Sequence, residues 1–105
     1  MHILTRAQYR SRAAVAKALA HPSRLLIVDL LRSGEKCAGD LVEAVGAEGP
    51  TVSRHLTVLL NAGLVAQDKR GAFVFYRVTC PCIANFFSCM DAVVTTQART
   101  LAKLA

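Results

Sequence analysis

The chain has 105 residues, 53% of them hydrophobic, which excludes a disordered tail and fits one domain, residues 1–105, with a single core. No apolar run approaches the roughly 18–20 residues of a membrane-spanning helix, and the N-terminal residues lack the apolar stretch of a secretory signal, so we expect a cytoplasmic protein with no membrane contact. Thirteen Lys and Arg residues against seven Asp and Glu residues give a formal net charge of +6, which favours a polyanionic partner wherever the cations cluster.

Four helices are expected in the first half of the chain. Apolar residues recur at helical spacing up to Leu19 and again after the interruption at His21-Pro22-Ser23. Pro22 suits the first turn of the second helix, and a glycine follows the end of each later one. The predicted helices span residues 4–19, 22–32, 37–45 and about 50–61.

The fourth helix has one apolar side and one polar, cationic side. Its apolar residues at helical spacing are expected in the core; they are Val52, Leu56, Leu59 and Leu60. The opposite side carries Thr51, Arg54 and Thr57, with His55 at its edge. An ordinary surface helix usually carries Glu and Lys, but no acidic residue occurs from Gly49 through Gln67. This pattern favours contact with DNA over a merely solvated face.

Two alternating strands, residues 64–69 and 72–78, follow this helix and meet at the basic turn Lys69-Arg70-Gly71. A cationic helix followed by a basic hairpin suits a DNA groove and its flanking phosphates. The residues expected to contact double-stranded DNA are Thr51, Ser53, Arg54, His55, Thr57, Lys69 and Arg70.

A long final helix is predicted from Cys80 to about Leu101. Its apolar stripe, which includes Phe86, Phe87 and Met90, is wider than a small core can cover. We therefore expect a homodimer whose interface is formed by the terminal helices, about residues 4–19 and 80–103.

These motifs together resemble the ArsR/SmtB family of winged-helix repressors over about residues 13–95. The matching segments are His21-Pro22-Ser23-Arg24-Leu25, Asp40-Leu41, Pro50-Thr51-Val52-Ser53-Arg54-His55-Leu56, Ala62-Gly63-Leu64-Val65 and Arg70-Gly71. The resemblance implies a mainly α fold with a small β-hairpin wing (α+β), a winged helix-turn-helix of order α-α-α-α-β-β-α. It also implies a cytoplasmic homodimer that binds an inverted-repeat operator until an inducer lowers its affinity and releases transcription of a detoxification or efflux gene.

The chain departs from the family pattern in three places. Glu48 and Gly49 stand where members often carry a Ser-Gln pair before the recognition helix. Cys37 is only the first residue of the Cys-x-Cys pair found in common arsenic sensors. The last helix has Asp91 as its only acidic residue and no His, so the ligands of the zinc-sensing members are absent from it.

Four cysteines, Cys37, Cys80, Cys82 and Cys89, are expected to be thiols in a reducing cytosol. Thiolates bind soft ions such as arsenite, antimonite, copper(I), cadmium, lead or mercury, and three of them suit pyramidal As(III). The stretch CPCIANFFSC resembles the arrangement of family arsenite sensors, which carry cysteines near the start of the last helix. Cys80, Cys82 and Cys89 are therefore the expected ligands of an As(III) or similar inducer, with Cys37 either a further ligand or a buried apolar residue. No organic cofactor is expected.

The spacing of these cysteines restricts how a site can form. Cys82 and Cys89 would share a helix face but lie ~10 Å apart along its axis. Either the first turn unwinds, or the site crosses an antiparallel pair of these helices centred near Asn85 and Phe86, which we favour. The rival inducer is a persulfide or oxidant that bridges Cys37 to Cys82 or Cys89.

Two other classes of protein are disfavoured. A thiol enzyme needs a base such as His, and none lies near a cysteine in the sequence; nor does the chain carry a phosphate-binding glycine loop, so we expect no catalysis and no small organic substrate. A winged-helix module that binds another protein would be expected to lose its cations, whereas Arg54, Lys69 and Arg70 are present.

Overall fold

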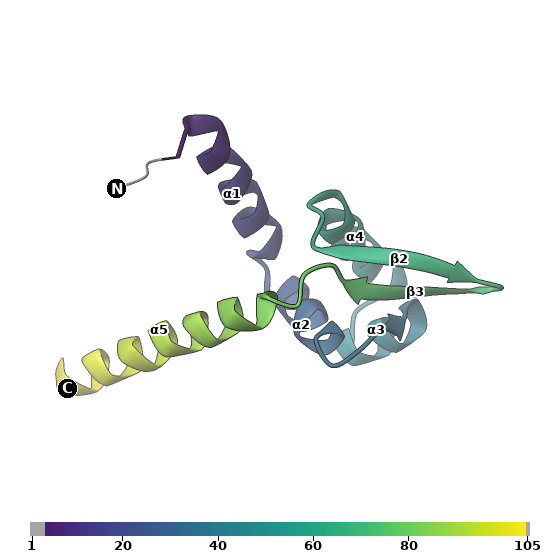
Figure 1. Ribbon diagram of the computed structural model, residues 1–105. Coiled ribbons are helices and arrows are strands. Elements are labelled where there is room, and N and C mark those ends of the chain that lie inside the picture. Colours follow the sequence, from purple (N-terminus) through teal and green to yellow (C-terminus); the bar gives the residue numbers. More distant parts are fainter. Residues whose placement is uncertain (1–3, 105) are drawn as a thin grey trace.

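A computed structural model describes residues 4–104 of the chain (Figure 1). The elements in chain order are α1 (Arg6–Leu19), α2 (Pro22–Leu31), β1 (Lys36–Cys37), α3 (Ala38–Val45), α4 (Gly49–Asn61), β2 (Val65–Arg70), β3 (Phe73–Val78) and α5 (Ile83–Leu104). The winged helix-turn-helix and its order α-α-α-α-β-β-α are confirmed, with one short additional strand, β1, between α2 and α3.

Local hydrogen bonds explain where the first helices begin. At α1, the Thr5 hydroxyl accepts from the Gln8 backbone N–H at 3.2 Å, while the Gln8 side chain accepts from the Thr5 N–H at 2.7 Å. This capping box starts the helix at Arg6, two residues after the predicted start. At α2, Pro22 occupies the first turn as expected, and His21 Nδ1 accepts from the Ser23 N–H at 3.0 Å.

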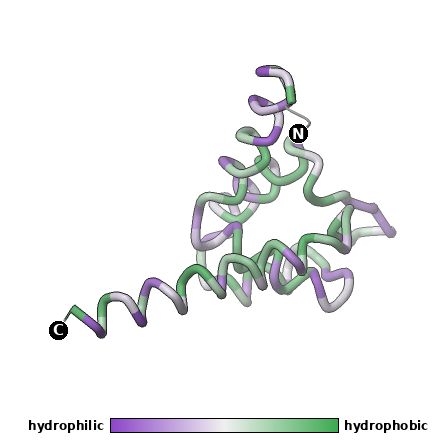
Figure 2. Tube along the Cα trace, turned by 60° about the vertical axis from the view of Figure 1, so that its left-hand side comes forward, coloured by the Kyte–Doolittle hydropathy of each residue, from purple (hydrophilic) through white to green (hydrophobic). Residues whose placement is uncertain are grey.

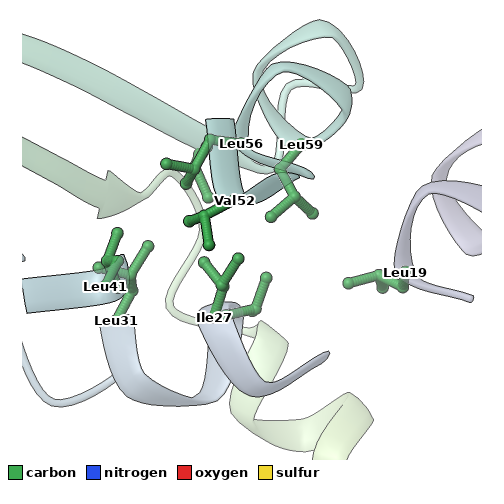
Figure 3. Close-up of a cluster of buried hydrophobic side chains, with 9 residues drawn as sticks. Leu19, Ile27, Leu31, Leu41, Val52, Leu56 and Leu59 are labelled. Carbon is green, nitrogen blue, oxygen red and sulfur yellow. The ribbon is translucent and has the colours of Figure 1, made fainter. Parts of the chain in front are cut away.

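The core lies where α2, α3 and α4 meet the sheet, and α1 adds Leu19 at its C-terminal end (Figure 3). Three of the four residues predicted on the inner side of α4 are buried, and Leu60 is half-buried against them. The buried residues of this cluster are Leu19, Ile27, Val28, Leu31, Leu41, Val52, Leu56, Leu59 and Val65. The orientation predicted for α4 is therefore confirmed.

The sheet is antiparallel, with strand order β1-β3-β2. The wing, which we define as β2, β3 and their turn, closes with Arg70 opposite Phe73, and Gly71 takes a positive φ of 62° there. Strand β1 pairs Lys36 with Tyr76 and Cys37 with Phe75. Two residues carry too little periodicity to predict a strand, so β1 exists only because β3 lies beside it.

The terminal helices extend away from this body, and α5 and the wing point in opposite directions (Figure 1). Within α5, which is described in full, no residue is buried, and Phe86, Val93 and Leu101 are 41%, 63% and 61% exposed. Figure 2 shows the hydrophobic residues spread along this projecting helix. The radius of gyration, 16.2 Å, exceeds the ~13 Å of a compact domain of this length.

The start predicted for α5 at Cys80 is wrong by three residues. Cys80, Pro81 and Cys82 form a turn in which Ile83, Ala84 and Asn85 donate to carbonyls three residues back, at 3.0–3.3 Å. The regular helix begins only at Ile83, and it ends at Leu104, beyond the predicted Leu101. None of the helices in residues 4–104 has the length and apolar character needed to cross a membrane.

Candidate nucleic-acid interface and thiol site

The outer face of α4 presents the side chains of Ser53, Arg54 and Thr57 to solvent, while Thr51 is half-buried. The Thr57 hydroxyl donates to the Ser53 carbonyl at 3.0 Å, which leaves its oxygen available as an acceptor. Glu48 is the N-cap of α4, and its side chain makes no capping hydrogen bond. Among the described residues, no ion pair involves Arg54. This face can therefore offer a cation and hydroxyls to a groove.

His55, also predicted to contact DNA, is half-buried and engaged within the protein. Arg24 Nε donates to His55 Nδ1 at 3.2 Å, and Arg24 Nη1 donates to the Ala18 carbonyl at 3.1 Å. The ring of His21 lies 4.4 Å from that of His55, centroid to centroid. Burial first, and then unfavourable electrostatic interactions with His21, Arg24 and Arg54, lower the pKa of His55. Its Nδ1 is therefore an internal acceptor that ties α4 to α2, and through Arg24 to the end of α1.

On the wing, Lys69 and Arg70 differ in the partners of their side chains. Lys69 is exposed and takes part in none of the ion pairs that the described residues form. Arg70 Nη1 and Nη2 donate to the two carboxylate oxygens of Glu35 at 2.6 and 2.8 Å, and its Nε donates to Asp68 at 3.1 Å. Its guanidinium carbon also lies 4.6 Å from the centroid of the Phe75 ring. The hydrogen bond from Arg70 lowers the pKa of Glu35, and Glu35 and Asp68 raise the pKa of Arg70.

The cysteines are not all thiols, contrary to our expectation. Cys80 and Cys82 form a disulfide, with their Cα atoms 5.3 Å apart. The reason is local: the turn at Pro81 brings the two residues within the 4.4–6.8 Å that a disulfide spans. Cys89 is exposed on α5, and Cys37 is half-buried at the N-cap of α3.

The described part of a single chain does not assemble a metal site. Within residues 4–104, no group of three or more His, Cys, Asp or Glu side chains is placed to hold a metal ion. Cys80, Cys82 and Cys89 are thus not brought together within one chain, and Cys37 lies at the end of β1 as the N-cap of α3. A site formed across two chains stays a prediction.

An open cleft of about 510 Å³ lies beside the disulfide turn, between the end of α2 and the start of α5. Pro81 and Ile83 form part of its wall. Its charged residues are Asp29, Arg32, Glu35 and Arg77. Arg32 pairs with Asp29 at 2.7 Å and Glu35 pairs with Arg70, so most of these charges are already neutralised. The cleft borders the turn at Pro81, but neither Cys80 nor Cys82 lines it.

Sequence reasoning missed two residues that organise the candidate interface, Arg24 and Glu35. Arg24 stands in the segment that carries the family resemblance, but nothing there indicates that it would reach His55, 31 residues later. Glu35 lies in a loop, 35 residues before Arg70, and no local pattern joins the two. Only the folded chain brings these partners together.

Comparison with known proteins supplies a family. Residues 21–67 match the family model described as bacterial regulatory protein, arsR family. The regulator NmtR of Mycobacterium tuberculosis is 47% identical over 64 residues, or 61% of this chain and 53% of NmtR, so the chain spans about half the length of that relative. An arsenical resistance operon repressor of Staphylococcus xylosus is 40% identical over 70 residues, which are 67% of each protein.

A solved structure covers more of the chain. It is the homodimeric winged helix-turn-helix DNA-binding domain Mb0332 of Mycobacterium bovis, described as a possible ArsR-family transcriptional regulator. The two structures are similar with a TM-score of 0.78, at 30% sequence identity and over 95% of each chain.

Proposed function

Because the chain belongs to the ArsR/SmtB family of bacterial transcriptional regulators, we propose that it is a cytoplasmic repressor that binds operator DNA as a homodimer. In this proposal, a thiophilic inducer, arsenite or antimonite, binds cysteine thiolates and releases the DNA. Members of the family regulate transcription and are not enzymes, in agreement with the absence of catalysis that we expected.

The observation that carries the DNA-binding proposal is the composition of the exposed surface of α4 and the wing. Arg54 and Lys69 are exposed without an ion-pair partner among the described residues, and Ser53 and Thr57 lie beside Arg54 on α4. Arg54 suits a base edge or a phosphate, and Lys69 a phosphate. Thr51, His55 and Arg70, the other residues predicted to contact DNA, lie on the same elements, but His55 and Arg70 have partners within the protein.

A mobility shift on the DNA upstream of its own gene tests this proposal. The complex should weaken steeply as salt rises, because each neutralised phosphate releases counterions. An unrelated duplex of equal length is the matched control and should bind more weakly. If binding depends on neither the salt concentration nor the DNA sequence, the repressor proposal is wrong.

The dimer is proposed from the apolar surface that a single chain leaves exposed. On α1, Tyr9 and Val15 are 51% and 38% exposed, and on α5, Phe86 and Val93 are 41% and 63% exposed. Large apolar side chains aligned on projecting helices favour burial against a second copy. The homodimeric state of the Mb0332 domain supports the same proposal.

The inducer site is proposed to cross the dimer. Cys80 and Cys82, once reduced to thiolates, come from one chain and Cys89 from the other, with Cys37 as a possible further ligand. The arsenical resistance operon repressor among the relatives supports arsenite as the first inducer to test. Mixing a Cys80→Ser/Cys82→Ser chain with a Cys89→Ser chain should restore one three-thiolate site per heterodimer. If no mixture recovers arsenite binding, the crossed site is wrong.

A second candidate inducer, an oxidant or a reactive sulfur species, is favoured by the disulfide between Cys80 and Cys82. In this case the protein with the Cys80–Cys82 disulfide and the protein with the two reduced thiols would differ in DNA affinity, and no metalloid would be needed. Mass spectrometry after treatment with a sulfide donor, run beside an arsenite titration, separates the two inducers. An added mass of sulfur with no response to arsenite would favour the sulfur species.

A further inference from the structure

Arg70 was predicted to contact a phosphate, but its side chain is held by the protein itself. We propose that Arg70 is a positioning residue that locks the wing to Glu35, and that the phosphate contact at the wing belongs to Lys69. This inference rests on the proposed DNA-binding function, because it assigns roles within that same interface.

Every nitrogen of the Arg70 guanidinium already donates a hydrogen bond. Nη1 and Nη2 form a two-pronged ion pair with Glu35, at 2.6 and 2.8 Å, and Nε reaches Asp68 at 3.1 Å. One face of the group covers the Phe75 ring at 4.6 Å. A single exposed ion pair contributes little to stability, but a bidentate pair within a network has more effect. Two of the five N–H groups lie outside these bonds, but two carboxylates already balance the charge of the group, so a phosphate would have to compete with them.

The position of Glu35 explains what the pair accomplishes. Glu35 directly precedes β1, which is anchored to β3 only through Lys36–Tyr76 and Cys37–Phe75. Within residues 4–104, the outer part of the wing, Lys69 to Val74, therefore has no third strand beside it. The Glu35–Arg70 pair, which we call the wing latch, replaces that support at the last residue of β2.

The latch also determines which charges the wing presents to DNA. Arg70, Glu35 and Asp68 together carry a net charge of −1, so Arg70 adds no net positive charge to the wing, and without it both carboxylates would repel a phosphate backbone. Of the two cations beside the turn of the wing, Lys69, exposed and outside these pairs, is then the one available to a phosphate. Two neighbouring cations thus have different tasks.

The test rests on Glu35→Gln, whose effect on binding has opposite signs under the two roles, and on the salt slopes of Arg70 and Lys69 variants. Binding of a labelled duplex from the DNA upstream of its gene is measured by fluorescence anisotropy at several salt concentrations. If Arg70 positions the wing, Glu35→Gln, Arg70→Gln and Arg70→Lys each weaken binding by roughly threefold to tenfold with an unchanged salt slope, because Lys lacks the fork. Lys69→Gln should lower the slope by about 0.9, the value for one phosphate contact.

Glu43→Gln is the matched control for Glu35→Gln, because it removes the same charge from an exposed residue of α3 outside the latch. The proposal is overturned if Glu35→Gln strengthens binding beyond Glu43→Gln, or if Arg70→Gln lowers the salt slope while Arg70→Lys does not. Amide hydrogen exchange in the DNA-free protein gives an independent readout: Glu35→Gln and Arg70→Gln should both speed exchange in residues 69–74. A wild-type protein that binds no DNA refutes the proposed function, and the exchange result alone then decides whether the latch exists.

Discussion

The polar side chains of α4 and the wing fall into two groups: those exposed to solvent and those that have hydrogen-bond partners within the protein. Ser53, Arg54 and Lys69 face solvent, whereas His55 and Arg70 donate or accept within the protein. His55 is a residue whose protonation state matters, because its Nδ1 must be unprotonated to accept from Arg24. Burial first, and then unfavourable electrostatic interactions with His21, Arg24 and Arg54, oppose protonation of His55.

This environment predicts how stability depends on pH. Because the pKa of His55 is lowered in the folded state, the unfolded chain binds the proton more readily. The contribution of His55 to the free energy of unfolding is therefore fully present above its unfolded pKa of 6.5, and it is lost as the pH falls from there through the folded pKa. Urea denaturation between pH 7.5 and pH 5 measures this loss.

His55→Gln is the control, since a glutamine oxygen can still accept from Arg24 but does not titrate. The variant should show a shallower loss of stability over the same pH range. An identical slope in both proteins would mean that His55 does not carry the effect.

At the scale of elements, α5 is the helix whose apolar residues a single chain leaves most exposed. It is 22 residues long, yet none of its residues is buried in the single chain. Phe86 and Val93 are seven residues apart, so they lie on nearly the same side of the helix as parts of one exposed stripe. We propose that a second copy of the chain covers this stripe with its own α5 and α1.

A charge placed in this stripe should therefore abolish the dimer. Val93→Glu would bury an unpaired carboxylate, and we expect the dimer dissociation constant to rise by roughly 100-fold or more. Sedimentation at several concentrations measures this change. Thr95→Glu adds the same charge to the opposite side of α5 and should leave the dimer intact. Equal effects from both variants would show that charge, and not the stripe, controls assembly.

At the scale of the whole molecule, the thiol turn and the DNA-binding elements meet at one residue. Thr79 follows β3 directly and precedes Cys80. Its hydroxyl donates to the Gly63 carbonyl at 2.6 Å, and its N–H donates to the Leu64 carbonyl at 3.1 Å. Through Thr79, the Cys80–Cys82 turn is therefore connected to the loop between α4 and β2 and also to the end of the wing.

Such an attachment predicts reciprocal coupling between inducer and DNA. Arsenite should weaken DNA binding of the reduced protein by about 5- to 150-fold, the usual range for allosteric coupling, and operator DNA must weaken arsenite binding by the same factor. Anisotropy and calorimetric titrations measure the two factors. A Cys80→Ser/Cys82→Ser/Cys89→Ser variant should keep its DNA affinity and lose the response. A response that survives in this variant would place the inducer elsewhere.

The sequence by itself determined the helices, the wing and the buried side of α4. Those features depend on local patterns: apolar spacing places Val52, Leu56 and Leu59 in the core, and Pro22 and Gly71 mark a helix start and a turn. Two predictions at the start of α5 are wrong: the helix does not begin at Cys80, and Cys80 and Cys82 are not free thiols. Helical spacing alone does not reveal the turn at Pro81 that causes both differences.

Only the tertiary structure decided the pairing of β1 with β3 and the partners of His55 and Arg70. Arg24 and Glu35 lie 31 and 35 residues from the side chains that they hold, and neither the periodicity of a helix nor that of a strand extends so far. The sequence could say which side chains suit DNA, but a cation is available to a phosphate only if the fold has not already paired it. That condition separates Lys69 from Arg70.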